Sequence, residues 1–167
     1  MRVRQPYRRD WDRRQFLAGL AAASAAGIVR SAHARDDDRV AYVRDLYLRE
    51  IEMHNRRAPT SAAAFFALFA RDLRELMQAP RPYAGREPIG HILHAFFGWG
   101  ILPGRQVKFV QAVAADGGQV RVDLEAPAGA RQIMVRPVRE NGLWKIADIS
   151  YESGDSLRAY YRRVTGR

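Results

Sequence analysis

The sequence predicts an α+β domain in which helices come first, a four-stranded antiparallel sheet follows, and a short helix closes the chain. Two observations carry this prediction. Apolar residues recur at helical spacing between residues 40 and 77, and from Arg105 onward they alternate with polar residues at a period of two. Segregation of helices from strands along a chain is typical of α+β rather than α/β proteins.

Residues 1–34 have the three-part organisation of an export signal. Arginines dominate the first fourteen residues, a weakly apolar run extends from Phe16 to Val29, and small residues end in Ala32-His33-Ala34. The apolar run is shorter than the roughly 20 residues that a membrane-spanning helix needs. We therefore predict an export signal over residues 1–34, with Ala34 as the expected cleavage position, and a single domain over residues 35–167.

Residues 13–17, Arg-Arg-Gln-Phe-Leu, resemble the twin-arginine export motif. Asp12 stands where Ser or Thr is usual, and Ala18 stands where Lys is frequent. Arg30, after the apolar run, also fits this class, because a positive charge there disfavours the general secretory route. The resemblance implies passage of the folded chain through the twin-arginine translocase and a periplasmic location. A general secretory signal that contains two arginines is the alternative.

Charge, cysteine content and motifs exclude several classes of protein. The formal net charge is +10, but residues 1–34 contain seven Arg and two Asp and so account for half of it. The remaining basicity is a weak argument for nucleic-acid binding, and no nucleic-acid partner is expected. The sequence contains no Cys, which excludes disulfides, thiol catalysis and a lipidated cysteine. It has no phosphate-binding loop or dinucleotide fingerprint, so no cofactor is expected.

Three helical segments are expected before the sheet. The first covers residues 40–57 and ends before Pro59. The second begins at a Thr60 or Ser61 cap, carries a broad apolar stripe and ends at Ala79-Pro80. A short third helix or turn is expected over residues 89–97, before a glycine-rich break.

The four strands are separated by residues that favour turns. Val107, Phe109, Gln111 and Val113 are expected on one face of the first strand, which a turn over residues 116–118 ends. The second strand covers residues 120–125, and a turn over 127–129 follows.

The third and fourth strands are joined by a predicted hairpin. Pro137 lies inside the third strand and implies a sheet edge or a bulge, because proline cannot donate to a strand ladder. Asn141-Gly142 predicts the tight turn that joins it to the fourth strand, which begins at Trp144. Gly154-Asp155 is expected to cap the last helix.

The C-terminal stretch Leu143–Ile149, with Tyr151, Gly154 and the run Ser-Leu-Arg at residues 156–158, resembles the closing strand and helix of a known group. That group is the exported bacterial domains of unknown function in the nuclear-transport-factor-two-like superfamily, which also holds SnoaL-like proteins and ketosteroid isomerase. The resemblance implies a cystatin-like cone, a curved sheet around helices with a possible cavity. It does not imply one activity, because the superfamily includes enzymes, ligand binders and interaction modules.

Resemblance to known proteins has two further implications. Domains of this fold often dimerise through the sheet, so a homodimer is possible, although Arg121, Asp123 and Glu125 indicate that part of one sheet face is wet. The same C-terminal stretch is similar to phospholipid-shuttle proteins of the MlaC type, which implies a periplasmic lipid carrier as an alternative function.

Asp148 is the candidate catalytic residue. On a regular strand it shares a face with Trp144 and Ile146, and if the helices cover that face its carboxylate points into the cone. Burial there would raise its pKa and suit a general base of the isomerase or dehydratase type. The alternative is a structural aspartate that accepts hydrogen bonds from backbone amides near Ser150.

Five aromatic residues are the candidate ligand-binding residues. Tyr47 and Tyr151 offer phenolic donors to a pocket, although such tyrosines are often core residues. Phe97 and Trp99 belong to an apolar cluster beside glycines that suits either a lid over a cavity or ordinary core closure. Trp144 completes the set as a neighbour of Asp148 on the same strand.

The spacing of the histidines is only weak evidence for a metal-binding site. His91 and His94 are three residues apart and share a helical face, but no recognised ligand set completes the pair, so no metal site is expected. His54 stands near a helix end, where a protonated ring is favourable. The sequence as a whole predicts an exported domain that binds an apolar small molecule or a partner protein without catalysis, with the isomerase-type enzyme and the lipid carrier as alternatives.

Overall fold

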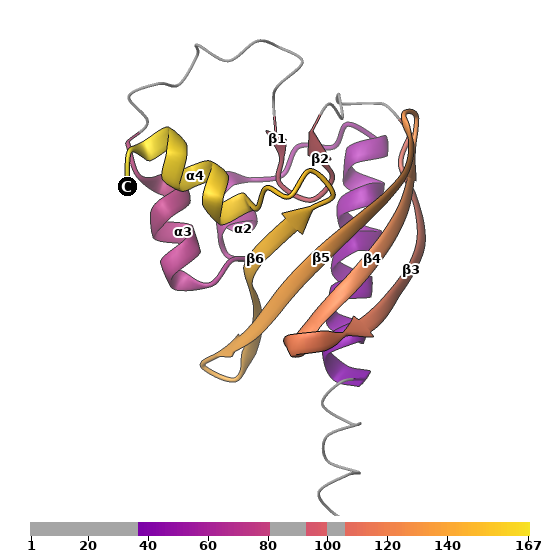
Figure 1. The fold of residues 1–167 in the computed structure, drawn as a ribbon, viewed down its shortest axis with the longest axis horizontal. Coiled ribbons are helices and arrows are strands. Elements are labelled where there is room, and N and C mark those ends of the chain that lie inside the picture. The colour runs from indigo at the N-terminus through magenta and orange to yellow at the C-terminus, as the bar shows by residue number, and fades with distance from the viewer. Residues whose placement is uncertain (1–36, 81–92, 100–105) are drawn as a thin grey trace, which may run out of the picture. The chain divides into compact units, whose positions relative to one another are not determined.

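The computed structural model describes residues 37–80, 93–99 and 106–167, all of which belong to one compact unit, Asp36–Arg167. The predicted α+β class is confirmed. Four antiparallel strands form an open sheet in chain order, followed by a C-terminal helix (Figure 1). The strands are β3 (Lys108–Ala115), β4 (Gln119–Ala126), β5 (Gly129–Glu140) and β6 (Leu143–Tyr151). No helix of the described residues is long and apolar enough to cross a membrane.

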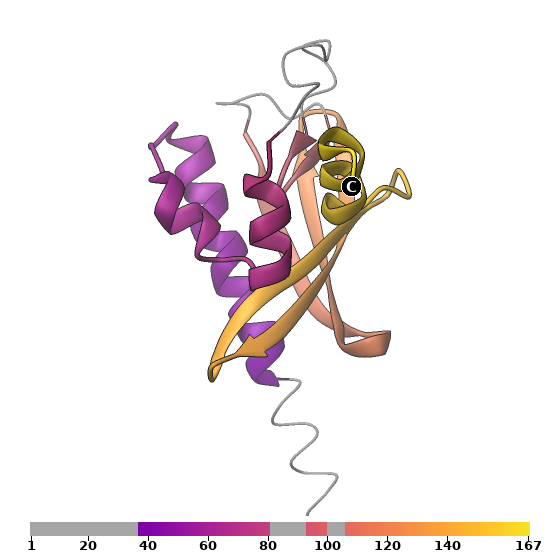
Figure 2. The same ribbon diagram turned by 90° about the vertical axis from the view of Figure 1, so that its left-hand side faces the viewer.

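A long helix over residues 37–55 lies against one face of the sheet (Figures 1 and 2). Near its start, Tyr42 stacks on Trp144 with ring centroids 6.2 Å apart. At its end, the Asn55 amide exchanges two hydrogen bonds with the backbone of Val107, at 2.8 and 3.0 Å. The helix therefore runs from the β5–β6 hairpin to the start of β3.

The prediction of one continuous second helix is wrong, because this part of the chain forms two helices. The helices α2 (Ala62–Phe66) and α3 (Arg71–Gln78) are separated by a short extended segment. There the Ala70 N–H donates to the Ile146 carbonyl at 2.8 Å, and the Ile146 N–H donates to the Leu68 carbonyl at 2.9 Å. This pairing covers the outer edge of β6. Backbone hydrogen bonds to β6, which is distant in sequence, therefore outweigh the helical periodicity of the residues between α2 and α3.

Where the structure describes it, the expected third helix or turn is a turn at residues 95–97 and not a helix. Residues 93–99 form a tight hairpin of β1 (Leu93–His94) and β2 (Gly98–Trp99), with a turn between them. Gly98 is required at the hairpin, because its φ is +84° and a Cβ there would lie 3.2 Å from the Tyr151 ring. Residues 89–92 of the expected helix lie outside the described residues.

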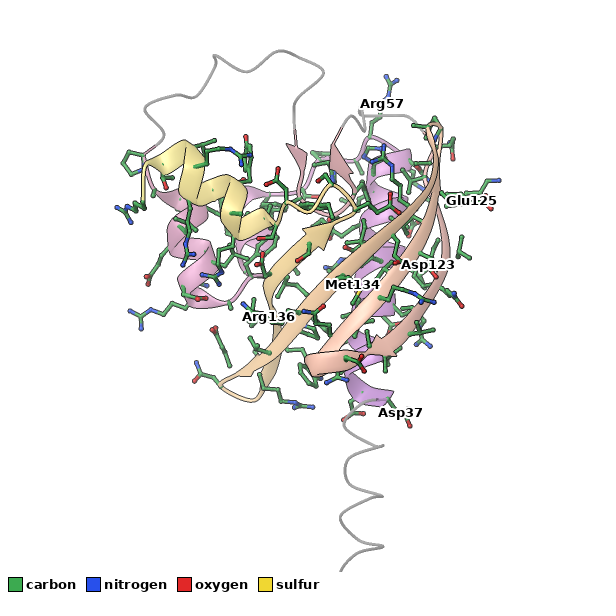
Figure 3. All side chains as sticks on the ribbon, in the orientation of Figure 1. Asp37, Arg57, Asp123, Glu125, Met134 and Arg136 are labelled. Atoms are coloured by element: carbon green, nitrogen blue, oxygen red, sulfur yellow. The ribbon has the colours of Figure 1, made fainter. Side chains whose placement is uncertain are left out.

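A bulge changes the predicted alternation of β3. Phe109 pairs with Leu124 and Gln111 pairs with Asp123, so Val110 is an extra residue and is 53% exposed. Gln111 therefore lies on the outer face, where its amide donates to Asp123 at 2.6 Å, and not on the face of Phe109. The alternation predicted for β4 is confirmed: Asp123 and Glu125 lie on the outer face with Met134 and Arg136 of β5 (Figure 3).

The prediction for Pro137 is confirmed on both counts. The β4 ladder ends at Val120 and Val135, so β5 has only β6 as a neighbour at Pro137. The β5–β6 register also shifts between Arg136 and Pro137. The predicted Asn141-Gly142 turn is present, with φ of 51° and 78°.

Large apolar side chains fill the space between the sheet and the helices. Tyr47, Phe69 and Phe96 have no exposed surface, and Phe69 and Phe96 stack with ring centroids 5.8 Å apart. The inward residues of the sheet complete this core: Val120, Val122, Leu124, Ile133, Val135, Ile146, Ile149. The described core is thus packed with side chains, and its pockets lie at its margins.

Candidate functional site

Two polar residues lie within the apolar stripe of the long helix. The residues of this helix that face the core recur at three- and four-residue spacing, and Glu50 and His54 occupy two of these positions. Each has only 9% of its surface exposed, and they are the buried polar residues of the described chain. Burial of a carboxyl group and an imidazole on the core side of a helix is costly without a compensating role.

The end of the same helix shapes one wall of a pocket. The Ala58 N–H donates to the Met53 carbonyl and the Arg57 N–H donates to the His54 carbonyl, a Schellman ending. Arg57 occupies the left-handed position of this motif, with φ of 53°. Its side chain extends beyond the helix end (Figure 3), and the following residues turn back towards α2.

The β1–β2 hairpin brings His94 to this place. The His94 ring stacks on Phe97 with centroids 4.3 Å apart and meets the His54 ring edge-on at 5.2 Å. Its Nδ1 accepts a hydrogen bond from the Phe96 N–H at 3.3 Å. Because Nδ1 is an acceptor, the neutral imidazole carries its proton on Nε2.

These elements enclose a pocket of about 350 Å³, hereafter the histidine pocket. Met53, Phe65 and Phe96 supply much of its apolar lining. Its polar lining consists of Glu50, His54, Arg57, Thr60, His94. A second pocket of about 360 Å³ shares Glu50, Met53 and Thr60 with it and adds Arg49 and α2 residues. Glu50 thus borders two adjoining hollows of the size that small molecules occupy in proteins.

The environment of Glu50 is apolar on one side and weakly ion-paired on the other. Burial raises the pKa of the Glu50 carboxyl, and the nearby Arg49 guanidinium partly offsets this effect. The closest Arg49 nitrogen lies 3.3 Å from Glu50 Oε1, and the Arg49 side chain is more than half exposed. Such an exposed partner contributes little energy. The Arg49 guanidinium donates to Glu50 Oε1 through both Nε and Nη2, at 3.4 and 3.3 Å, and these two long bonds are the contacts that partly offset its burial.

His94 is neutral at physiological pH. Burial, with a smaller contribution from the adjacent His54, lowers the pKa of His94 from 6.5 to about 4. A neutral imidazole can donate from Nε2 and does not compete with Glu50 for a cation. The pocket therefore combines a desolvated carboxyl group, a neutral hydrogen-bond donor and aromatic walls, an arrangement that can hold a small molecule of mixed polarity.

No group of three His, Asp or Glu side chains suited to a metal ion occurs within residues 37–80, 93–99 and 106–167. His91, the predicted neighbour of His94, lies outside these ranges, and His94 lies on a strand rather than the expected helix.

Asp148 lies where its carboxylate supports the last helix, α4 (Leu157–Thr165). Its Oδ1 accepts from the Ile149 N–H at 2.9 Å and from the Arg158 N–H at 3.0 Å. Ser156, which replaces the expected Gly154-Asp155 cap, accepts from the Ala159 N–H at 3.2 Å. Asp148 thus binds backbone amides at the start of α4, which is the structural alternative weighed from the sequence.

The predicted shared face of Asp148, Trp144 and Ile146 is wrong, because β6 contains a bulge. Arg136 pairs with Asp148 and Pro137 pairs with Ile146, so Ala147 is an extra residue in the ladder. The buried side chains after the bulge are Ile149 and Tyr151, and Asp148 alternates with them. A one-residue insertion reverses the faces of all later residues in a strand.

Three of the predicted ligand-binding aromatics belong to the core. The Tyr47 ring meets Phe96 edge-on at 5.8 Å, and its buried hydroxyl has no hydrogen-bond partner among the described residues. Burial raises the pKa of Tyr151, whose hydroxyl donates to the Ala95 carbonyl at 2.6 Å. Phe97 supports the His94 ring and, with Tyr151, lines a small hollow of about 120 Å³ on the other side of the hairpin.

Trp144 does not join this group. Trp144 stacks on Tyr42 and lies under the Arg139 guanidinium, 4.6 Å from the ring centroid, beside the β5–β6 turn. Six residues of β6 lie between it and Tyr151. The backbone of Trp99 pairs with Leu93, and its side chain lies outside the described residues.

Sequence reasoning missed Glu50 and related His54 only to the helix dipole. The signal was present, because Glu50 and His54 follow Val43 and Tyr47 at the spacing of the apolar stripe. A polar residue at a stripe position indicates either a satisfied core group or a site. The approach of His94 carried no sequence signal, since it depends on how the hairpin packs.

Comparison of the chain with protein-family models, curated proteins and solved structures finds no match.

Proposed function

We propose that this chain is an exported periplasmic domain that binds a small molecule of mixed polarity in the histidine pocket, without a cofactor. The observation that carries the proposal is the convergence of Glu50, His54 and His94 on one otherwise largely apolar pocket. Buried titratable groups with shifted pKa values are concentrated at functional sites. Here the shift of Glu50 disfavours its charged form in the folded protein, so a ligand that solvates the carboxyl group accounts for its presence.

The pocket suits a compact ligand. Its volume of about 350 Å³ lies at the lower end of the range for small-molecule sites. Aromatic side chains fill the described core. The ligand therefore binds at the margin of the core, between the end of the long helix, α2 and the β1–β2 hairpin. This location favours a small organic molecule over a long acyl chain.

The proposal also includes the location of the protein and its finer fold class. The arginine pair, weakly apolar run and small residues of positions 1–34 support export by the twin-arginine translocase. The order of helices, meander and last helix supports the cone-shaped nuclear-transport-factor-two-like assignment. No nucleic acid is proposed as a partner, and the charged outer sheet face makes that face a poor apolar dimer surface.

Native mass spectrometry of protein recovered from the periplasm tests the proposal. The chain is expressed with residues 1–34 in place, and a variant with Arg13→Lys and Arg14→Lys controls for the export route. We expect a non-covalent mass on the wild-type protein. Thr60→Trp, which fills the wall shared by both pockets, should remove it.

Ala63→Trp is the matched control for the pocket. Ala63 is an exposed residue of α2 that lines neither of the two pockets. The bound mass should persist in this variant. A wild-type protein that carries no added mass, or a mass that survives Thr60→Trp, would contradict binding at the histidine pocket.

A further inference from the structure

We propose that the ligand of the histidine pocket is a short amino acid whose ammonium and carboxylate groups lie at opposite ends of an apolar chain. Glu50 receives the ammonium group, and Arg57 receives the carboxylate. The inference rests on the proposed function, because it names the chemical class of the molecule that binds in the same pocket. It goes further by assigning one residue of the pocket to each end of that molecule.

One oxygen of the Glu50 carboxyl group is available to a ligand. The two hydrogen bonds from the Arg49 guanidinium both reach Oε1, and no described residue donates to Oε2. The Glu50 side chain is only 10% exposed and lines both pockets, so the hollows are the open side of this group. Because burial raises the pKa of Glu50 and so disfavours the carboxylate, a cationic donor at Oε2 would offset the desolvation.

Arg57 supplies a cation to the same pocket. Its guanidinium makes no ion pair with a described residue, whereas Arg44 and Arg56 both pair with carboxylates of nearby residues. The backbone of Arg57 has a φ of 53°, a conformation that favours glycine, so the backbone gives no reason for an arginine here. Its side chain is therefore the feature that a function would use, and a guanidinium binds a carboxylate through two parallel hydrogen bonds.

The spacing of the two charges sets the length of the ligand. Glu50 and Arg57 are seven residues apart, which is about 10 Å along a helix that rises about 1.5 Å per residue. A helical side chain such as that of Glu50 leans towards the helix start, and that of Arg57 extends beyond the helix end (Figure 3), so this value is a lower bound. A hydrogen bond of about 2.8 Å at each end leaves at least about 4 Å between the two charges of the ligand. An α-amino acid, whose two charged groups share one carbon atom, is too short.

The other walls of the pocket suit the rest of such a molecule. Met53, Phe65 and Phe96 offer apolar surface to the methylene groups between its two ends. Burial lowers the pKa of His94 to about 4, so this ring is neutral and adds no cation to the pocket. A simple amine would leave the guanidinium without an anion, and a simple acid would leave the buried carboxylate without a cation. A ligand with both charges satisfies both groups.

Isothermal titration calorimetry with probes of one chain length tests this class. The probes are 6-aminohexanoate, hexylamine and hexanoate, titrated into protein that has been recovered from the periplasm and dialysed. We expect 6-aminohexanoate to bind at least about tenfold more tightly than either one-ended probe, because each charged end adds a charge-assisted hydrogen bond. The isomer 2-aminohexanoate, whose charged groups share one carbon atom, should bind no more tightly than hexylamine.

Two variants separate the two ends of the ligand. Glu50→Gln removes the charge that receives the ammonium group and should weaken 6-aminohexanoate and hexylamine by at least about tenfold, but not hexanoate. Arg57→Gly removes the guanidinium, suits the left-handed backbone and should weaken 6-aminohexanoate and hexanoate by a similar factor, but not hexylamine. Glu52→Gln and Arg56→Gln are the matched controls, because these two side chains are exposed, pair with each other at 2.9 Å and line neither of the two pockets. Both controls should bind 6-aminohexanoate as the wild type does.

Each outcome decides the inference. Equal affinities for the three probes overturn it, as do tighter binding of 2-aminohexanoate and equal losses in Glu50→Gln and Glu52→Gln. Circular dichroism shows whether Glu50→Gln is folded, and Arg57→Gly, at an exposed position, gives an independent measure if it is not. A bound mass in mass spectrometry without a preference for 6-aminohexanoate leaves the proposed function intact and removes this inference. A wild-type protein that carries no mass and binds none of the probes removes both.

Discussion

At the scale of single residues, the main feature is the placement of two polar groups among the core positions of the long helix. Glu50 and His54 lie at core positions of the long helix, and burial raises the pKa of Glu50 while it lowers that of His94. Both shifts disfavour the charged forms in the folded protein. Natural proteins retain such groups where binding or chemistry requires them.

Stability should depend on pH through His94. The folded protein keeps this ring neutral down to a pKa of about 4, whereas the ring in the unfolded chain titrates near 6.5. The unfolded state therefore binds more protons between these values, so the contribution of His94 is fully present above pH 6.5 and is lost as the pH falls towards 4. The loss is at most about 3.5 kcal/mol, because a tenfold change in a protonation equilibrium corresponds to about 1.4 kcal/mol.

Urea unfolding at several pH values measures this effect. His94→Asn keeps the acceptor for the Phe96 N–H and removes the titrating group, so its free energy of unfolding should fall less steeply between pH 6.5 and 4. At about pH 7.5 the ring is neutral in both the folded and the unfolded chain, so the difference between the two proteins there reports the lost ring contacts with Phe97 and His54 and not protonation. An unchanged slope in the variant would show that His94 is not held neutral.

At the scale of elements, both helices that flank β6 are capped by carboxylates from the sheet. Glu140 accepts from the Arg71 N–H at the start of α3, at 3.1 and 3.2 Å, where Ala70 offers no side-chain cap. Asp148 accepts from the Arg158 N–H at the start of α4. The Arg158 side chain then joins the two helices by donating to Asp72 at 2.8 Å. Negative groups at helix N-termini also interact favourably with the helix dipole.

Replacement of Asp148 should expose its structural contribution. Asp148→Ala leaves the Ile149 and Arg158 amides without their acceptor and should lower the free energy of unfolding by about 1–2 kcal/mol. Asp148→Asn keeps an acceptor oxygen and should cost less. The measurement is the urea midpoint, with Ser156→Ala as a capping variant of the same helix; an Asp148→Ala protein as stable as the wild type would contradict this role.

At the scale of the whole molecule, one extended segment joins the helices to the sheet. Phe69 has no exposed surface and contacts Phe65 of α2 and Phe96 of the hairpin, with ring centroids 5.2 and 5.8 Å away. Its neighbours pair with the Ile146 backbone on the edge of β6. The segment therefore contributes to the core and also protects an otherwise open strand edge.

Truncation of Phe69 should weaken every part of the fold together. Phe69→Ala should lower the free energy of unfolding by about 3–5 kcal/mol, a large share of the roughly 5–15 kcal/mol typical of a domain. Phe66→Ala, at a half-buried position of α2, should cost clearly less. Thermal and urea unfolding measure both, and equal losses in the two variants would contradict the central position of Phe69.

The predictable part of the fold is the part that depends on local pattern. The apolar stripe around Val43 and Tyr47 correctly indicates the long helix, and Asn141-Gly142 correctly indicates the hairpin turn. Pro137 marks a real irregularity in the β5–β6 ladder. The candidate site was less predictable, because its members come from the long helix, the 57–60 loop, α2 and a hairpin that lie far apart in sequence.

By itself, the sequence determined the α+β class, the succession of long helix, four-stranded meander and last helix, and the core face of the long helix, because these follow from residue spacing and turn chemistry. Only the tertiary structure decided the break at Leu68–Ala70, the bulges at Val110 and Ala147, and the approach of His94 to His54. The reason is physical. Each depends on backbone pairing or packing between distant segments, and one extra residue in a ladder reverses the face of every side chain after it.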